Sequence, residues 1–426
     1  MLYVQIIVLL LLLLLEYVTS KRDIMHISFM SLASFIFALL LVAVNISWEY
    51  EMSGKTAFII TMTFLSIFLG EHFQRYFVKK TRTKYVPMPF EGVKVNSKIY
   101  MASVVLMIGA VIIYVGGVLT VGRAALTEGL GNGSVFSAYR YSAVQQGTSG
   151  SSIMSIAIVI LECFSNTYML LYITNRKEKK YLLPIILYLI AAVFSTGRMA
   201  IIKFAIVTLV LYYLLISRPK GQTRKFETTM IKVLVIGIGV FIGLGMLTGK
   251  SGFYSSVFEN VSMYIASGIP AFDKSIEVAR TGFTGTSIWG IVNFLSKFGI
   301  EFSVKNNYLP YVYFPYMNHS TNIYTFLKRP YEDFGILLML ILFFVIAVIY
   351  TKAYSKIVNQ SCKRYTFTVL MYSSMYYPIF MTFSDFRFSD ILSLTGIIQI
   401  VIYYVIAKKI DCQLKYVDKE RKNYAK

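Results

Sequence analysis

The chain has 426 residues, of which 56% are hydrophobic, 16% aromatic and 15% charged, and its mean hydropathy is +0.62. This composition offers too little polar surface to cover a water-soluble globule of that length, so a membrane is the expected solvent. The formal charge of +21 does not indicate nucleic acid as a partner, because the basic residues fall in short breaks between apolar segments.

The apolar segments predict an all-α integral membrane protein with about eleven transmembrane helices. The first segment lacks the basic start and small-residue cleavage site of a secretory signal, which indicates an uncleaved anchor. The expected spans are 2–19, 25–46, 56–73, 99–119, 151–173, 181–196, 199–217, 231–249, 335–351, 365–381 and 390–407.

Lysine and arginine concentrate in alternate breaks between these spans. Because short basic loops are retained in the cytoplasm, we expect the amino terminus outside and the carboxyl terminus inside. The expected divisions are eight spans over 1–249, a large external loop at 250–334 between helices 8 and 9, three spans over 335–407 and a basic cytoplasmic tail at 408–426.

Three expected external segments differ from the others in length or polarity. They are the glycine-rich 120–150, the aromatic 250–334 and the short turn 384–390. Long loops in compact proteins are functional or disordered, and the aromatic content here favours order. The apolar stretch 288–295 is too short to cross and predicts a re-entrant or interfacial helix.

Arg198 follows Ser195-Thr-Gly in an expected external hairpin between two spans. One interpretation is that its planar guanidinium binds a diphosphate through paired hydrogen bonds, with backbone donors of the tight turn beside it. The other is that it anchors the helix end by reaching the lipid headgroups. Both remain open from the sequence.

The stretch 318–335 brings acid, base and cation to the start of the ninth span. Asp333, or less favourably Glu332, could deprotonate a sugar hydroxyl. The alternative is that these carboxylates complement the helix dipole. His319, the one histidine expected outside, is either a general base or an ordinary hydrogen-bonded loop residue.

The other external arginines, with Arg198, could form a cationic basin for an anionic, diphosphate-bearing substrate. Each alone could equally be a solvated or headgroup contact. They are Arg123, Arg140, Arg280, Arg329 and Arg387.

Glu162 lies in the middle of a span and is a functional candidate, with an interhelical hydrogen bond as the alternative. No CxxC or HExxH metal spacing occurs, and no metal or cofactor is expected.

The turn Ser195-Thr-Gly-Arg198, the large late loop, Asn322-Ile-Tyr-Thr-Phe and Tyr331-Glu-Asp-Phe-Gly335 together resemble the Wzy-type oligosaccharide repeat-unit polymerases of bacterial surface polysaccharides. In this resemblance Arg198 matches the short-loop arginine and Asp333 the acidic position before a helix. Some family members carry an arginine, ten residues and a glycine. Arg140 with Gly150 and Arg280 with Gly290 each miss that spacing by one residue.

The resemblance implies a glycosyltransferase in the bacterial cytoplasmic membrane, without cofactor. It would transfer a glycan from undecaprenyl diphosphate to the sugar hydroxyl of another lipid-linked unit on the outer face, making capsule, O-antigen or exopolysaccharide. Implied partners are lipid-linked oligosaccharides, membrane lipids, and chain-length regulator and flippase proteins of the same pathway. The alternatives are an O-antigen ligase-like transferase, a lipid-linked oligosaccharide flippase or other transporter, and a non-catalytic assembly component.

Overall fold

The computed structural model describes most of the chain and is 79% helical. The described residues are 1–77, 90, 95–130, 133–143, 151–176, 178–195, 198–247, 257–277, 282–296, 298–300, 309–314, 319–359, 362 and 364–424. Within these ranges, seven helices are long and apolar enough to cross a membrane: Leu2–Thr19, Ile27–Val44, Gly54–Phe77, Ser97–Thr127, Ser152–Thr174, Met199–Ser217 and Lys328–Val358. The chain is therefore a multi-pass helical membrane protein.

The chain divides into two compact units that interleave along the sequence. Unit 1 contains Met1–Thr81, Tyr254–Lys356 and Met375–Leu394, and unit 2 contains Arg82–Phe253, Ile357–Ser374 and Thr395–Lys426. Contacts between segments distant in sequence decide these units, so hydropathy does not reveal them. The expected division into spans, external loop and tail concerns the path of the chain across the membrane and stays a prediction.

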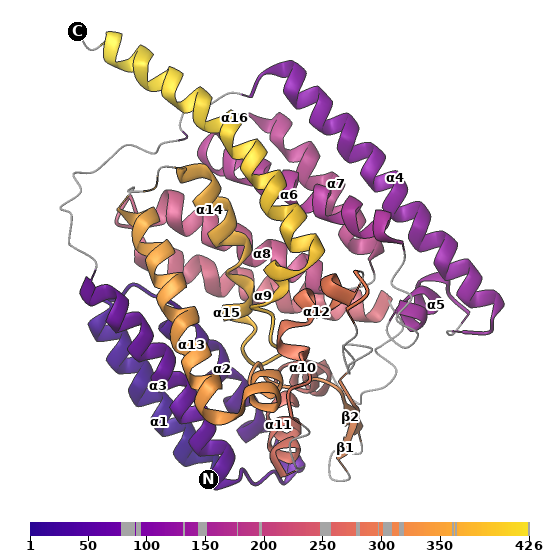
Figure 1. Cartoon of the computed structure of the whole chain (residues 1–426), viewed down its shortest axis with the longest axis vertical. Helices are drawn as coiled ribbons and strands as arrows, with labels where there is room; N and C mark the ends of the chain where they lie inside the picture. Colours follow the sequence, from indigo (N-terminus) through magenta and orange to yellow (C-terminus); the bar gives the residue numbers. More distant parts are fainter. Residues whose placement is uncertain are drawn as a thin grey trace. The chain divides into compact units, whose positions relative to one another are not determined.

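Unit 1 begins with a group of apolar helices that pack on one another. Its elements are α1 (Leu2–Thr19), α2 (Ile27–Val44), η1 (Ile46–Trp48), α3 (Gly54–Phe77), α10 (Val257–Ile265), α11 (Gly268–Glu277), η6 (Thr286–Ile288), α12 (Trp289–Ser296), β1 (Val312–Phe314), β2 (His319–Thr321), most of α13 (Lys328–Val358), α15 (Tyr377–Phe380) and η8 (Asp390–Leu392). In Figure 1, α1 to α3 run alongside the orange α13.

The turn between α1 and α2 has an unusual backbone. Lys21 and Arg22 both have positive φ, at 56° and 66°. Consecutive non-glycine residues in this region are uncommon because the β-carbon approaches the backbone carbonyl. The turn reverses the chain within a few residues, so that the end of α1 and the start of α2 lie at the same end of unit 1.

An aromatic core fixes the chain immediately before α13. The Phe326 ring lies 5.8 Å from Phe64 of α3 and 4.8 Å from Phe343 of α13, and Phe35 of α2 lies 5.1 Å from Phe64. Phe35, Phe64 and Phe326 are fully buried. The hydroxyl of Ser66 also donates to the Leu340 carbonyl at 2.6 Å, which joins α3 to α13. This packing sets the position of the residues that follow Phe326.

Helix α13 contains a sharp break at Gly335. That residue has φ 71° and ψ −176°, so Lys328–Phe334 forms a short helical segment set apart from the long apolar helix. Only glycine adopts this conformation without marked strain, because it has no β-carbon. The break coincides with the expected start of the ninth span at residue 335.

The expected loop 250–334 contains ordered elements where the structure describes it. They are α10, α11, η6, α12 and an antiparallel hairpin in which Val312, Tyr313 and Phe314 of β1 pair with Thr321, Ser320 and His319 of β2. In Figure 1 these elements gather near the end of α13 that lies closest to the N-terminus. The expected helix at 288–295 agrees with α12.

Unit 2 is a second group of helices. Its elements are α4 (Ser97–Thr127), α5 (Val135–Tyr141), α6 (Ser152–Thr174), η3 (Lys179–Tyr181), α7 (Leu182–Phe194), α8 (Arg198–Tyr212), η4 (Tyr213–Ser217), α9 (Thr223–Leu247), α14 (Tyr365–Ser374) and α16 (Leu394–Tyr424). Its core includes Tyr114, Tyr139, Leu161, Tyr188 and Phe204. Helix α16 continues through the region expected as a tail, as far as Tyr424.

Polar side chains also join the helices of unit 2. Glu162, near the middle of α6, lies 2.8 Å from the Lys203 Nζ of α8 and accepts a hydrogen bond from Gln399 at 3.1 Å. Tyr403 is fully buried and bonds to Asn166 at 2.8 Å and to Ser374 at 2.7 Å. Buried polar groups are stable in an apolar medium only when they are paired in this way.

Candidate functional site at the start of α13

Two basic residues follow the aromatic core directly and are almost entirely buried. Lys328 is 4% exposed, and its Nζ lies 2.5 Å from Glu332 Oε1 and 4.3 Å from the centre of the Tyr324 ring. Burial and the Glu332 carboxylate raise the pKa of Tyr324 to about 12, and its phenol donates to the Pro310 carbonyl at 3.0 Å. The carboxylate and the ring face together compensate the buried ammonium group.

Arg329 forms a two-pronged ion pair with Asp385. Its Nε lies 2.5 Å from Oδ1 and its Nη2 2.9 Å from Oδ2, and the arginine is 3% exposed. Arg387 Nη2 lies 3.6 Å from the same carboxylate. Burial alone would raise the pKa of Asp385, but Arg387 and Arg329 hold that pKa below its ordinary value. The geometry is the paired fork that suits arginine better than lysine.

Asp333 is engaged by the loop that leads into α12. Its Oδ1 accepts hydrogen bonds from the backbone N–H groups of Thr284 at 2.8 Å and Gly285 at 3.0 Å and from the Thr284 hydroxyl at 2.6 Å. Its Oδ2 accepts from the Ser287 N–H at 2.7 Å. Four donors occupy a carboxylate that is 5% exposed, so the contacts describe a residue that holds the 284–287 turn against α13.

The turn 384–390 supplies the other side of this group. Tyr377 donates a short hydrogen bond to Asp390. The ring of Phe386 lies 6.0 Å from Phe343, which anchors the turn to α13. Arg387 is 44% exposed, whereas the Asp385 side chain beneath it is 13% exposed. The turn therefore presents a cation to its surroundings above a buried carboxylate.

The accessible and buried groups differ in what they can do chemically. Glu332 and Arg387 are the partly exposed ones, at 34% and 44%. A carboxylate of this kind can accept a proton and a guanidinium can bind a phosphate oxygen. Lys328, Arg329 and Asp333 are buried and compensated by their partners, which suits the positioning of the exposed groups.

Three other residues expected in the site have side chains outside the described part of the chain. His319 lies in β2 opposite Phe314, but its side chain is outside the described part, as is that of Arg198 at the start of α8. Arg280 lies outside the described residues altogether. These three predictions stay untested.

Arg123 and Arg140 belong to unit 2. Arg123 is exposed on α4 and Arg140 is partly buried on α5. The ring of Phe136 lies 5.6 Å from Phe194, so α5 packs at the end of α7 that leads towards Arg198. Arg140 and the start of α8 thus share one end of unit 2.

Gly290 has a packing role that is separate from its spacing to Arg280. A β-carbon there would lie 2.7 Å from the backbone nitrogen of Ser393, so α12 approaches the η8 turn too closely for a side chain. Gly150, the glycine of the other near match, lies outside the described residues.

Asp385 and Lys328 were not among the candidate residues. A signal for Asp385 was present, because an arginine buried beside an apolar core needs a carboxylate partner and the 384–390 turn offers acids. Among the described residues, no group of three or more histidine, cysteine or acidic side chains is arranged to hold a metal ion.

Comparisons with protein-family models, with curated proteins and with solved structures find no match to this chain.

Proposed function

We propose that the protein is a membrane glycosyltransferase that polymerises undecaprenyl-diphosphate-linked oligosaccharide repeat units on the outer face of a bacterial cytoplasmic membrane. The observation that carries the proposal is that buried residues at the start of α13 hold two partly exposed groups: Lys328 pairs with the Glu332 carboxylate, and Arg329 pairs with Asp385, which Arg387 also approaches. The eleven-pass topology, with the amino terminus outside, is part of the same proposal.

In this proposal Arg387 binds the diphosphate of the donor lipid, and Arg329 with Asp385 holds the 384–390 turn in place. Glu332 accepts the proton of the acceptor hydroxyl. The hydroxyl oxygen forms a bond to the anomeric carbon while the bond from that carbon to the diphosphate oxygen breaks, and the lipid diphosphate leaves. The diphosphate role expected of Arg198 and Arg140, which belong to unit 2, is proposed separately for that unit.

The site combines polar groups with exposed aromatic side chains and neighbouring apolar helix faces, which suits a substrate made of sugars, a diphosphate and a lipid chain. Tyr313 and Phe283 are 54% exposed on the elements before α13. Aromatic surfaces of this kind pack against the faces of sugars and limit access of water, which would otherwise hydrolyse the donor. Apolar helix faces offer contacts for the polyprenyl chains.

The test is deletion of the gene followed by analysis of surface glycan and of lipid-linked intermediates. Single repeat units without long chains would support a polymerase. Intact long chains on undecaprenyl diphosphate would indicate a ligase, and loss of outward-facing lipid-linked units would indicate a flippase. An unchanged glycan would contradict all three.

Complementation with single variants tests the residues. Arg387→Ala, Glu332→Gln and Arg198→Ala are each expected to leave short or single units, with a reduction of about 10²-fold or more in polymer for the proton acceptor. Arg224→Ala, an exposed arginine near the start of α9, is the matched control and is expected to restore full chain length. Normal chains from Arg198→Ala would remove that residue from the site.

A transporter of lipid-linked oligosaccharides is the second candidate, and a specific observation favours it. Glu162 and Lys203 form an ion pair within two apolar helices of unit 2. Charged pairs at this depth mark substrate or ion pathways in many transporters. Glu162→Gln with Lys203→Gln would then abolish the outward-facing lipid-linked units, whereas a polymerase would keep them.

A further inference from the structure

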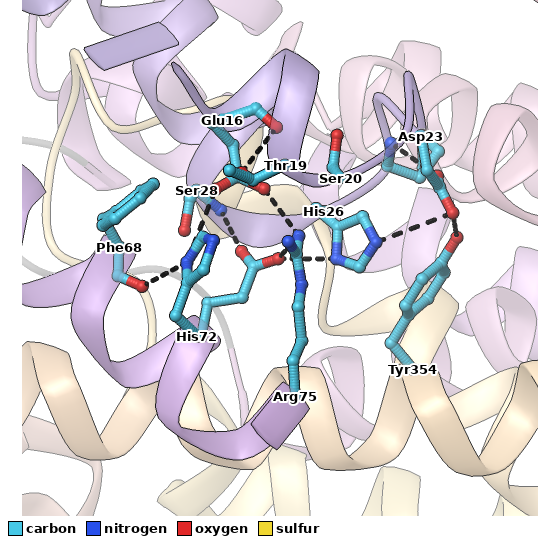
Figure 2. Close-up of polar contacts among 12 residues, drawn as sticks. Glu16, Thr19, Ser20, Asp23, His26, Ser28, Phe68, His72, Arg75 and Tyr354 are labelled. Carbon is cyan, nitrogen blue, oxygen red and sulfur yellow. Dashed lines mark hydrogen bonds and ion pairs between the residues drawn. The ribbon is translucent and has the colours of Figure 1, made fainter. Parts of the chain in front are cut away.

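A second polar cluster lies in unit 1 at the end opposite to the candidate site. Figure 2 shows it where the end of α1, the start of α2 and the end of α3 meet α13. Its titratable members, here called the Glu–His cluster, are Glu16, Asp23, His26, Glu71, His72, Arg75 and Tyr354. From Gly335 to Tyr354, α13 rises about 29 Å, close to the thickness of a bilayer core.

Glu71 is at the centre of the cluster and is saturated with donors. It is fully buried, and its Oε1 lies 2.6 Å from His26 Nδ1 and makes a short contact with Arg75 Nη2. Its Oε2 accepts from the Ser28 backbone N–H at 2.9 Å. Three donors from two helices stabilise the charged form of this carboxylate.

Glu16 is equally buried but has far fewer donors. Its Oε1 lies 2.5 Å from Arg75 Nη2, the nitrogen that also contacts Glu71. Its Oε2 is buried and receives no hydrogen bond from any described residue. The nearest ring nitrogen, Nδ1 of His72, is 3.7 Å away and lies 3.0 Å from the Phe68 carbonyl.

The third carboxylate is tied to α13 and to the start of α2. Asp23 Oδ2 accepts from the Tyr354 hydroxyl at 2.5 Å, and Oδ1 accepts from the Met25 N–H at 3.2 Å. His26 Nε2 lies 3.7 Å from Asp23, so both nitrogens of this ring face carboxylates.

Glu16 and Glu71 compete for a single guanidinium nitrogen. Arg75 Nη2 contacts both carboxylates, and His26 Nδ1 is directed at Glu71. The nearby lysines and arginines of the same elements, Lys21, Arg22, Lys352 and Lys356, are exposed. Tyr376 contributes a neutral hydroxyl, which donates to the Met25 carbonyl at 2.7 Å. Glu16 Oε2 thus lies buried without a donor from the described residues, and a charged carboxylate oxygen left unpaired in an apolar interior is costly.

We propose that the Glu–His cluster is a proton-binding site, in which Glu16 holds an exchangeable proton on Oε2. The proton reaches the aqueous phase through His72, whose side chain is 29% exposed, or through His26 and Asp23, which are 12% and 11% exposed. Chains of glutamate, histidine and aspartate at a membrane end serve as proton relays in other proteins. The site is distinct from the residues at the start of α13, and it does not depend on their proposed function.

The test is infrared spectroscopy of the purified full-length protein in lipid bilayers. At neutral pH the spectrum is expected to contain the carbonyl stretch of a protonated carboxylic acid, which shifts in heavy water and disappears as the pH is raised. Its absence from the unmodified protein would overturn the proposal, without need of any variant.

Variants assign the proton to one side chain. Glu16→Gln is expected to lose the band and to fold normally, because glutamine has the size of a protonated glutamate. Glu71→Gln is expected to weaken the band, since Arg75 then serves Glu16 alone. Glu162→Gln, a carboxylate of another helix paired with Lys203, is the matched control and should retain it. A band that persists in Glu16→Gln would overturn the proposal.

Discussion

Gly335 determines how the polar segment Lys328–Phe334 meets the apolar helix that follows. Its φ of 71° and ψ of −176° place it in a region that is essentially closed to residues with a β-carbon. A helix that continued straight through this residue would present the polar segment in a different direction. The orientation of Lys328 and Arg329 therefore depends on a backbone property and not on a side chain.

Gly335→Ala is expected to lower the free energy of unfolding by about 1–3 kcal/mol, because alanine is strained at this φ and ψ. The control is Gly116→Ala, in the middle of α4, where an added β-carbon would meet nothing within 4 Å. That substitution should be neutral or stabilising by up to about 1 kcal/mol. Thermal unfolding of the purified protein in detergent measures both. Equal effects would contradict the strained conformation.

Arg329 and Asp385 form a buried ion pair, so removal of either side chain leaves the charge of the other buried and less well compensated. Arg329→Met is expected to destabilise the protein by about 3 kcal/mol, since Asp385 then stays buried without the guanidinium that bonds to both of its oxygens. Arg329→Lys should recover part of the loss, because an ammonium cannot reproduce the two parallel hydrogen bonds. Denaturant unfolding of the three proteins gives the comparison, and equal stability of all three would exclude a role for the fork.

The ion pair of Asp385 should also make the free energy of unfolding depend on pH. The native pKa of Asp385 lies below its ordinary value, so its contribution is present above about pH 4 and is lost as the pH falls through the native pKa. Asp385→Asn is expected to be less stable at neutral pH and to lose less stability on acidification. Parallel acid profiles of variant and parent would contradict this assignment.

Among the elements, the 284–287 turn depends on a single carboxylate of α13. Asp333→Asn replaces two accepting oxygens by one oxygen and one donating amide, which then faces a backbone donor. The expected result is a loss of about 1–3 kcal/mol and faster hydrogen exchange at the Thr284, Gly285 and Ser287 amides. Glu332→Gln, the neighbouring and more exposed change, should leave those exchange rates unaltered. Unchanged exchange in Asp333→Asn would rule out the holding role.

The helical membrane class and many of the helices followed from hydropathy, since apolar runs of about 20 residues have few alternatives. The elements within 250–334 were harder to predict, because α10 and α11 are short and owe their order to tertiary packing. The expected span 365–381 is interrupted between Ser374 and Tyr377. Ser374 bonds to Tyr403 of α16 and Tyr376 donates to the Met25 carbonyl, and hydropathy does not register such contacts.

The side-chain pairings of the candidate site were not predicted from the sequence. Acid and base at the start of α13 were visible in the sequence, whereas the 56-residue separation between Arg329 and Asp385 hid their ion pair. Glu162 likewise pairs with Lys203 of another helix. Side-chain partners on different helices depend on how those helices pack, which no local pattern contains.

For the whole molecule, the proposed topology places the two ends of α13 on opposite faces of the membrane. Single cysteines at Tyr313, 54% exposed on β1, and at Tyr76, 85% exposed near the end of α3, report on the two ends. In a background with Cys163, Cys362 and Cys412 replaced by serine, an impermeant maleimide should label Tyr313→Cys on intact cells. Tyr76→Cys should react only after permeabilisation. Labelling of both on intact cells would exclude the proposed arrangement.

The backbone between α1 and α2 bears on how the first hairpin is made. Asparagine followed by glycine would adopt the left-handed conformations of Lys21 and Arg22 with less strain. The chain instead carries two cations there, which under the expected topology are the signal that keeps this turn on the cytoplasmic side during insertion. Replacing both residues with Asn-Gly would thus relieve the strained backbone. It would also remove two of the positive charges that orient the following helices during membrane insertion.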